Sequence, residues 1–223
     1  MRPRFAGRLS AADAVTAANA ALGFCAVAAM VGEGAVALGA RLVLLAAIAD
    51  GLDGVVARWR GGSALGDHLD SLADVASFGV APAALAYAAW YATDPTALDT
   101  VLAYGVPAAF VAVAVVRLAL YTELDAGEDC TRGAPTTLAG TLLAAGVLSG
   151  VPAWAVLAAA GAFTYLMVMP VTYPDLLDRD ALAMGVLQSG AVLAPTVASR
   201  AFPRALLAAG LAYLVLAPRF YWR

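Results

Sequence analysis

The sequence predicts an all-α integral membrane protein, and its composition and its long apolar runs carry this prediction. Of the 223 residues, 63% are hydrophobic and 13% are charged, whereas a soluble domain has roughly 45–50% apolar and about 25% charged residues. The mean hydropathy is +0.83, and the apolar residues gather in runs of about the 20 residues that a membrane span needs. A soluble globule or a disordered chain is therefore excluded.

Charge and cysteine content exclude further classes. All 13 basic residues are arginines and the net charge is −3, so we predict no nucleic-acid partner, because such surfaces are strongly basic. The two cysteines, Cys25 in an apolar run and Cys130 in a polar loop, do not form a disulfide scaffold and do not indicate a redox compartment.

Eight membrane-spanning helices are predicted, each ended by glycine, proline or charged residues that favour turns. The spans lie near residues 13–31, 35–58, 66–91, 98–121, 134–150, 152–170, 181–198 and 203–218. The seven breaks that separate them, in order, are residues 32–34, 60–62, 94–95, 123–132, 150–152, 173–175 and 201–203. The fifth and eighth runs are short, so seven and nine spans are the alternatives. No repeat or long linker divides the chain, which predicts a single domain over residues 1–223.

The arginines predict the orientation, because cytoplasmic loops are enriched in Lys and Arg. With eight spans and the N-terminus inside, ten arginines are cytoplasmic: Arg2, Arg4, Arg8, Arg58, Arg60, Arg117, Arg132, Arg179, Arg219 and Arg223. Arg200 and Arg204 fall in an outer loop, and Arg41 falls inside the second span. We therefore predict a multi-pass protein of the cell membrane with both termini in the cytoplasm. The first apolar run could pass for a signal peptide, but seven further spans favour an uncleaved helix.

Four aspartates lie at the predicted cytoplasmic ends of the second and third spans. Asp50 and Asp53 are three residues apart, and Asp70 and Asp74 are four apart, so each pair shares a helix face. A short turn at residues 59–65 makes the two helices antiparallel neighbours. The four carboxylates are therefore expected to converge on one pocket, which we place on the cytoplasmic side.

Carboxylates in such a low-dielectric pocket repel one another, and protonation or bound cations would relieve the repulsion. Their oxygens suit Mg²⁺ or Mn²⁺, which keep positions open for phosphate groups. Two divalent ions beside a carboxylate that accepts a proton are typical of phosphoryl-type transfer. Gly54, Ala57 and Gly66 leave the helix surfaces open to a ligand, and Arg58 can bind a phosphate.

The spacing of these residues resembles the signature of the CDP-alcohol phosphatidyltransferase family. All eight of its fixed positions are filled: Asp50, Asp53, Gly54, Ala57, Arg58, Gly66, Asp70 and Asp74. One departure is the seven residues between Arg58 and Gly66, where the family usually has eight, and we expect it to change the turn rather than the ligand geometry. Residues 69–82, 117–119 and 133–135 are similar to the phosphatidylserine synthases within the family, which include archaetidylserine synthases.

The resemblance implies a six-helix core, followed here by about two more helices, and a defined reaction. A phosphatidyl-type group passes from a CDP-activated lipid to the hydroxyl of L-serine, and CMP is released. The lipid is CDP-diacylglycerol or CDP-archaeol, and the acidic, Lys-free composition slightly favours the archaeal one. Members are commonly homodimers. Four residues are implied as metal ligands, with the last also the general base: Asp50, Asp53, Asp70 and Asp74. Six residues are implied to bind the CDP-lipid: Gly54, Ala57, Arg58, Gly66, Thr16 and Asn19.

Other polar residues keep two interpretations each. Arg117, in an apolar helix, either reaches the interface or binds an anion, and we favour binding of phosphate or of the serine carboxylate. Arg132 fits binding and solvation equally, and Ser77 contacts serine or bonds to its own helix. Asp67 is expected to be a solvated loop carboxylate and His68 a surface residue.

Three other functions remain as alternatives. The same chemistry could serve another acceptor, such as inositol, glycerol phosphate or glycerol. A membrane prenyltransferase also uses acidic Mg²⁺ sites, but its two acidic motifs lie on widely separated helices. A small transporter would show paired repeats and mid-membrane helix breaks, and this sequence has neither.

Overall fold

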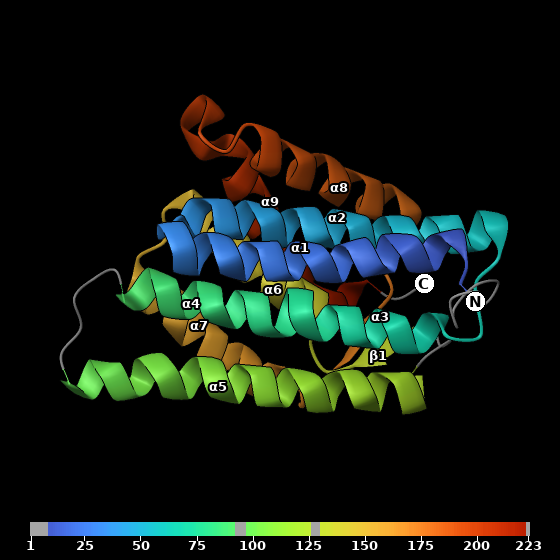
Figure 1. Cartoon of the computed structure of the whole chain (residues 1–223), viewed down its shortest axis with the longest axis horizontal. Coiled ribbons are helices and arrows are strands. Elements are labelled where there is room, and N and C mark those ends of the chain that lie inside the picture. The colour runs from blue at the N-terminus through green and yellow to red at the C-terminus, as the bar shows by residue number, and fades with distance from the viewer. Residues whose placement is uncertain (1–8, 92–96, 126–129, 222–223) are drawn as a thin grey trace, which may run out of the picture.

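The computed structural model describes residues 9–91, 97–125 and 130–221, which form a bundle of helices lying side by side (Figure 1). The predicted break at residues 94–95 lies outside the described residues. So do four of the arginines that carry the predicted orientation: Arg2, Arg4, Arg8 and Arg223.

The described helices follow the predicted spans in order. They are α1 (Ala11–Glu33), α2 (Val36–Arg60), α3 (Gly66–Asp74), α4 (Ala81–Tyr91), α5 (Ala97–Leu120), α6 (Thr136–Ser149), α7 (Ala153–Leu166), α8 (Asp178–Leu193) and α9 (Val197–Phe220). A π-helical segment, η1 (Val75–Val80), joins α3 to α4 in one rod, and a second, η2 (Tyr121–Asp125), extends α5. The seventh predicted span, 181–198, runs too far, because Pro195 disfavours helical backbone in the residue before it and α8 has ended by then.

Four of the described helical segments are long and apolar enough to cross a membrane, namely residues 11–32, 66–91, 100–125 and 197–220. The other four helices, α2, α6, α7 and α8, do not meet this requirement of length and apolar composition. α2 carries five charged residues, α6 and α7 have 14 residues each, and α8 has 16. The helical class is confirmed, and the number of eight crossings stays a prediction.

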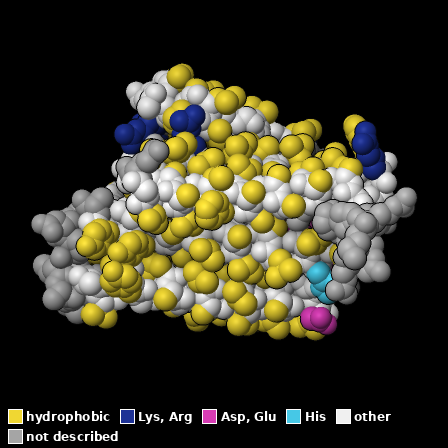
Figure 2. All heavy atoms as spheres, viewed as in Figure 1, with side chains coloured by type: hydrophobic (Ala, Val, Ile, Leu, Met, Phe, Trp, Pro, Cys, Tyr) yellow, Lys and Arg dark blue, Asp and Glu magenta, His cyan; other side chains and the backbone are white. Residues whose placement is uncertain are grey.

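The surface fits a bilayer better than water. In the face that Figure 2 shows, hydrophobic side chains cover the middle of the molecule, and the coloured charged side chains gather toward its two ends. Large apolar side chains such as Phe24, Leu182 and Val215 are about 70% exposed. Lipid chains are as apolar as these side chains, so exposure of this kind carries no penalty in a membrane.

Helix α6 forms the centre of the bundle (Figure 1), and almost all of its residues are buried. Apolar burial drives folding only weakly inside a bilayer, so close contact between small residues becomes the main source of packing energy. Gly23 of α1 shows this contact. A Cβ atom there would lie 2.8 Å from Oγ of Ser77 and 2.9 Å from the carbonyl carbon of Ala76. Glycine therefore sets the distance between α1 and η1.

A short antiparallel ribbon is the one described departure from an all-helical chain. Its strands, β1 (Cys130–Arg132) and β2 (Thr172–Pro174), pair Thr131 with Tyr173. Gly133 follows β1 at φ +79°, and a Cβ atom there would lie 2.0 Å from the carbonyl oxygen of Met167, so only glycine fits. The ribbon fastens the α5–α6 connection to the α7–α8 connection, and β1 is labelled in Figure 1.

Candidate active site

Three of the four signature aspartates form a compact group. Asp50 on α2 and Asp70 and Asp74 on α3 each place a carboxylate oxygen so that the three oxygens lie within 4.8 Å of one another. The turn between the helices reverses the chain and brings the two acidic faces together, as their spacing predicted. Three carboxylate oxygens this close repel unless a cation or a proton lies among them. Their hard oxygen chemistry and spacing fit a divalent cation such as Mg²⁺ or Mn²⁺.

Asp53 lies beside this group rather than within it. Its Oδ2 accepts a hydrogen bond of 2.7 Å from the hydroxyl of Thr16, and the same hydroxyl lies 3.1 Å from the carbonyl oxygen of Ala12 in its own helix. Both Thr16 and Asp53 are buried. Thr16 therefore fixes the side chain of Asp53 from α1 and leaves the second carboxylate oxygen for another partner.

Asp74 is supported by α1 and η1. The amide of Asn19 lies 3.5 Å from its Oδ1, and the hydroxyl of Ser77 donates a 2.8 Å bond to the backbone carbonyl of Asn19. Asn19 and Ser77 are both fully buried. The hydroxyl of Ser77 thus bonds to a neighbouring helix, a partner that neither of its two interpretations anticipated. Asn19 contacts Asp74 and does not line the nearby cavity.

A cavity of about 340 Å³ opens beside the aspartates, within the size range of small-ligand sites. It is lined by Ala12, Asp13, Thr16, Asp50, Asp53, Gly54, Ala57, Gly62, Ser63, Gly66, Asp67 and Asp70. Four of the six residues predicted to bind the CDP-lipid therefore line this one cavity, namely Thr16, Gly54, Ala57 and Gly66. Arg58 lies at its edge, since its Nη1 would be 3.7 Å from a Cβ atom on Gly54.

Asp13 is a cavity residue that the sequence analysis missed. It is buried, and it reaches the cavity because a capping box with Ser10 begins α1 here: the backbone nitrogens and side chains of Ser10 and Asp13 bond reciprocally, at 2.6 and 3.2 Å. The Ser-x-x-Asp pattern before an apolar run is a readable signal of such a helix start. Asp67 is exposed, but it lies in the first turn of α3 rather than in the predicted loop, and it lines the same cavity. His68 is exposed, as predicted.

Arg117 lies in a second, smaller site at the end of α5. It is 5% exposed, and its Nη2 donates a 2.7 Å bond to the hydroxyl of Thr131 on β1. The guanidinium carbon lies 5.1 Å from the ring centre of Tyr121, and Nε has no hydrogen-bond partner within the described part of the chain. The guanidinium is buried in protein, so it does not reach out to the interface.

Arg117 and Arg132 line one cavity of about 100 Å³, together with Asp125 of η2. Asp125 organises its wall, because its Oδ2 accepts a 3.2 Å bond from the hydroxyl of Thr131 and a 2.9 Å bond from the backbone nitrogen of Arg132. The two predicted anion-binding arginines thus line the same cavity. The hydroxyls of Ser71 and Thr122, 2.5 Å apart, connect α3 to η2 between the two sites.

Comparison with known proteins gives these sites a family. The family model of the CDP-alcohol phosphatidyltransferases matches residues 9–172, which is more than half of the chain and includes every site residue described above. The chain belongs to this family. The family assignment of the signature aspartates, with the transfer chemistry that the family's name describes, is therefore supported by a match over residues 9–172 and not by the motif alone.

Relatives of this phosphatidyltransferase include proteins named for serine. The archaetidylserine synthase of Methanothermobacter thermautotrophicus is 32% identical over 168 residues, 73% of this chain and 68% of that protein. The CDP-diacylglycerol–serine O-phosphatidyltransferase of Mycobacterium leprae is 46% identical over 84 residues, 37% of this chain and 26% of that protein. The Saccharomyces cerevisiae protein of the same name is 58% identical over 52 residues, 23% and 19% of the two chains. The matches thus span about a quarter or less of the last two proteins.

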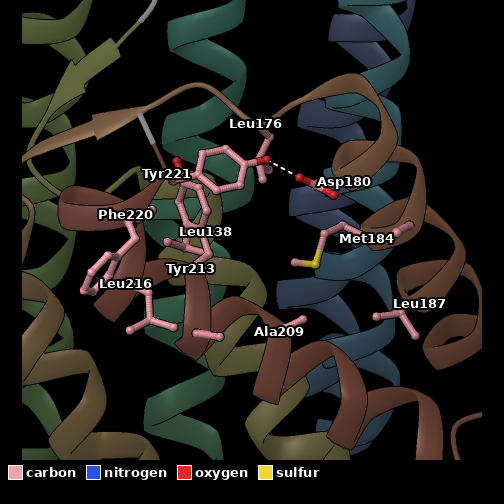
Figure 3. A pocket seen from close by; sticks show the side chains of 13 residues that line it. Leu138, Leu176, Asp180, Met184, Leu187, Ala209, Tyr213, Leu216, Phe220 and Tyr221 are labelled. Atoms are coloured by element: carbon pink, nitrogen blue, oxygen red, sulfur yellow. Dashed lines mark hydrogen bonds between the residues drawn. The ribbon is translucent and has the colours of Figure 1, made fainter. Parts of the chain in front are cut away.

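An apolar pocket of about 500 Å³ between α6, α8 and α9 is separate from the aspartate cavity. Figure 3 shows Met184 and Leu187 of α8 facing Ala209 and Leu216 of α9 across it. Asp180 is its one charged lining residue, and the hydroxyl of Tyr221 donates a hydrogen bond to that carboxylate (Figure 3). This pocket offers no cation and no set of carboxylates for a diphosphate, so the aspartate cavity remains the candidate active site.

Proposed function

We propose that this phosphatidyltransferase transfers a phosphatidyl-type group from a CDP-activated lipid to the hydroxyl of L-serine and releases CMP. The observation that carries the proposal is the approach of carboxylate oxygens of Asp50, Asp70 and Asp74 to within 4.8 Å of one another. Asp50 and Asp70 also line the cavity, together with the signature residues Asp53, Gly54, Ala57 and Gly66. The serine-specific names of its relatives support the choice of acceptor.

Donor binding follows from the shape and charge of the cavity. The nucleotide and its diphosphate lie against the small residues Gly54, Ala57 and Gly66, where a helix surface without long side chains permits close approach. Arg58, at the edge, presents its guanidinium fork to a phosphate oxygen pair. The aspartates would hold two divalent cations, Mg²⁺ or Mn²⁺, which would neutralise the phosphate oxygens and stabilise the charge on the leaving CMP.

The chemical step is an in-line displacement. The serine hydroxyl oxygen attacks the lipid-side phosphorus, a new O–P bond forms, and the bond between that phosphorus and the bridging oxygen of CMP breaks, so the electron pair leaves with CMP. Asp74 accepts the hydroxyl proton. Asn19 lies against one oxygen of Asp74, which leaves the other to face the nucleophile, and burial excludes bulk water from competing as acceptor.

Acceptor binding uses the site of Arg117. Its buried Nε, which has no hydrogen-bond partner among the described residues, and its Nη groups form a fork that fits the carboxylate of serine. Arg132 lines the same small cavity and adds a second positive charge. The contact between Ser71 of α3 and Thr122 of η2 holds this site against the helix of Asp74, and in the proposed arrangement serine bound to Arg117 directs its hydroxyl to that base.

The proposed orientation puts this end of the bundle in the cytoplasm, where CDP-lipid, serine and CMP are exchanged. Arg58 and Arg60, in the last turn of α2, lie at the same end as the aspartates, in line with the arginine rule. We further propose that the protein is a homodimer, which crosslinking in native membranes would test.

The test is an assay of CMP release by the purified protein in detergent with CDP-diacylglycerol or CDP-archaeol as donor. We expect release to require serine. Serine-independent release, or an equal rate with glycerol phosphate, inositol or glycerol, would reject the acceptor assignment. The same assay with both donors ranks ester-linked against ether-linked lipid.

A further inference from the structure

A groove distinct from the aspartate cavity runs along α2, on the side away from α1. It measures about 670 Å³ and lies between α2 and α8. Its apolar walls are Ile48, Leu52 and Val55 on α2 and Leu182, Gly185 and Val186 on α8. Of these, Leu52, Leu182 and Val186 are more than half exposed, so the groove opens to the surroundings of the protein, which in a membrane are lipid.

The groove comes close to the aspartate cavity at Arg58, although the two spaces share no residue among the described ones that line them. Asp50, Asp53 and Gly54 of α2 line the cavity, and Gly51 lines the groove. Arg58 lines the groove, and its Nη1 would lie 3.7 Å from a Cβ atom on Gly54 of the cavity. A ligand that enters both spaces therefore passes Arg58 where its charged part gives way to its apolar part.

Both walls contain an open position. A Cβ atom on Gly51 or on Gly185 would meet no atom within 4 Å, so the groove is free of protein at these two points. The polar side chain of Ser189, further along α8, is satisfied within its own helix by a 2.8 Å bond to the carbonyl oxygen of Gly185. Gln188 and Arg58 are the other polar side chains among the described lining residues, and the rest of the lining is glycine or hydrophobic, which suits a hydrocarbon.

Helix α8 is held in place at both ends while the groove stays open between them. Near its last turn, Nε of Arg41 on α2 donates a 2.6 Å bond to the carbonyl oxygen of Val192. Near its first turn, the hydroxyl of Tyr221 bonds to Asp180. The first bond ties α8 to α2, the second ties α8 to the end of α9, and neither fills the space between α2 and α8.

We propose that the α2–α8 groove holds a hydrocarbon chain of the CDP-activated lipid, with Arg58 at the junction between chain and diphosphate. This inference rests on the proposed function for the identity of the donor. α8 lies beyond residues 9–172, the part that matches the family model. The groove therefore gives the C-terminal helices a role in donor binding that the matched region alone does not contain.

Filling the groove tests the proposal. Gly185→Leu places a side chain in open space on the α8 wall. Gly105→Leu is the matched control, because Gly105 on α5 is exposed, also has no atom within 4 Å of a Cβ position and lies outside both cavities. For Gly185→Leu we expect the KM for a long-chain CDP-diacylglycerol to rise about tenfold, equivalent to about 1.4 kcal/mol. The KM values for a dihexanoyl donor and for serine should stay within about twofold, as should all values for Gly105→Leu.

An equal effect on long and short donors, or no effect on either, would overturn the proposal. A second measurement covers a variant that fails to fold and does not depend on turnover. CDP-diacylglycerol with a diazirine at the end of one chain is photolysed with the wild-type protein, and we expect labelling of residues 181–189. Labelling confined to other helices would reject the groove. If serine-dependent CMP release fails but α8 is labelled, the proposed function is wrong while the groove assignment stands.

Discussion

Replacement of Arg117 by lysine separates the two proposed binding sites. Lysine keeps the charge but presents a single ammonium group, which cannot form the paired bonds of a guanidinium with a carboxylate. A hydrogen bond to a charged group contributes roughly 1.5–3 kcal/mol, and each 1.4 kcal/mol is about tenfold in affinity. Loss of one such bond therefore predicts a rise of about 10- to 100-fold in the KM for serine.

The structure also gives the controls for this variant. Arg117 makes a 2.7 Å bond to Thr131, so Thr131→Val removes that anchor and retains the guanidinium, and we expect a smaller rise in the KM for serine. Arg204, exposed on α9, supplies the control Arg204→Lys, which should change nothing. The measurement is a pair of saturation curves, for serine and for CDP-lipid, on each purified variant.

The outcome distinguishes three roles for Arg117. The KM for CDP-lipid should change little, because the aspartates and Arg58 hold the diphosphate. If the KM for CDP-lipid rises and that for serine stays constant, Arg117 binds phosphate instead. If neither changes and only the midpoint of thermal unfolding falls, the residue serves to hold β1 against α5. An unchanged KM for serine refutes the carboxylate assignment.

Three further predictions concern the metal, the base and the ribbon. Activity should vanish in excess chelator and return with Mg²⁺ or Mn²⁺, since three clustered carboxylates need a cation; full activity in chelator would reject the metal site. Asp74→Asn should reduce kcat more than tenfold (over 1.4 kcal/mol in the barrier), while CDP-lipid binding is partly retained. Asp50→Asn should weaken metal and nucleotide binding as well. Turnover of Asp74→Asn within about tenfold of wild type would contradict the base assignment. Gly133→Ala should lower the thermal midpoint in detergent and raise the KM for serine, because its Cβ would lie 2.0 Å from the carbonyl oxygen of Met167 and must displace β1; an unaltered midpoint would show that the ribbon tolerates the shift.

Local spacing was enough to predict that Asp50, Asp70 and Asp74 come together at the candidate site. The i,i+3 and i,i+4 placement of the aspartates fixes which helix face each occupies. The turn after Arg60 is short, so the two helices that it joins must lie next to each other. Apolar runs likewise located the rods, because membrane spans are set by length and composition. The helix ends were less accurate, as Pro195 beyond α8 illustrates.

Contacts between distant segments were out of reach. Nothing in the periodicity around Asn19 shows that its amide meets Asp74, or that its carbonyl accepts a bond from Ser77. Thr131 lies in a polar stretch with no strand pattern, and its pairing with Tyr173 depends on how α6 and α7 place the two connections. Such pairings are tertiary, so a single sequence contains no local signal for them.

The π-helical segment η1 decides the angular relation between chemistry and packing in the third rod. It begins at Val75, directly after the proposed base, and a π turn holds one residue more than an α turn. Successive α-helical residues are rotated by about 100° around the axis. Removal of a single residue from 75–80 would let the rod return to α-helix and turn Asp70 and Asp74 by about that angle relative to α4, away from Asp50. The extra residue therefore lets α4 keep its contacts within the bundle while α3 faces its carboxylates toward α2. One uninterrupted α-helix with this sequence could not orient both segments in this way.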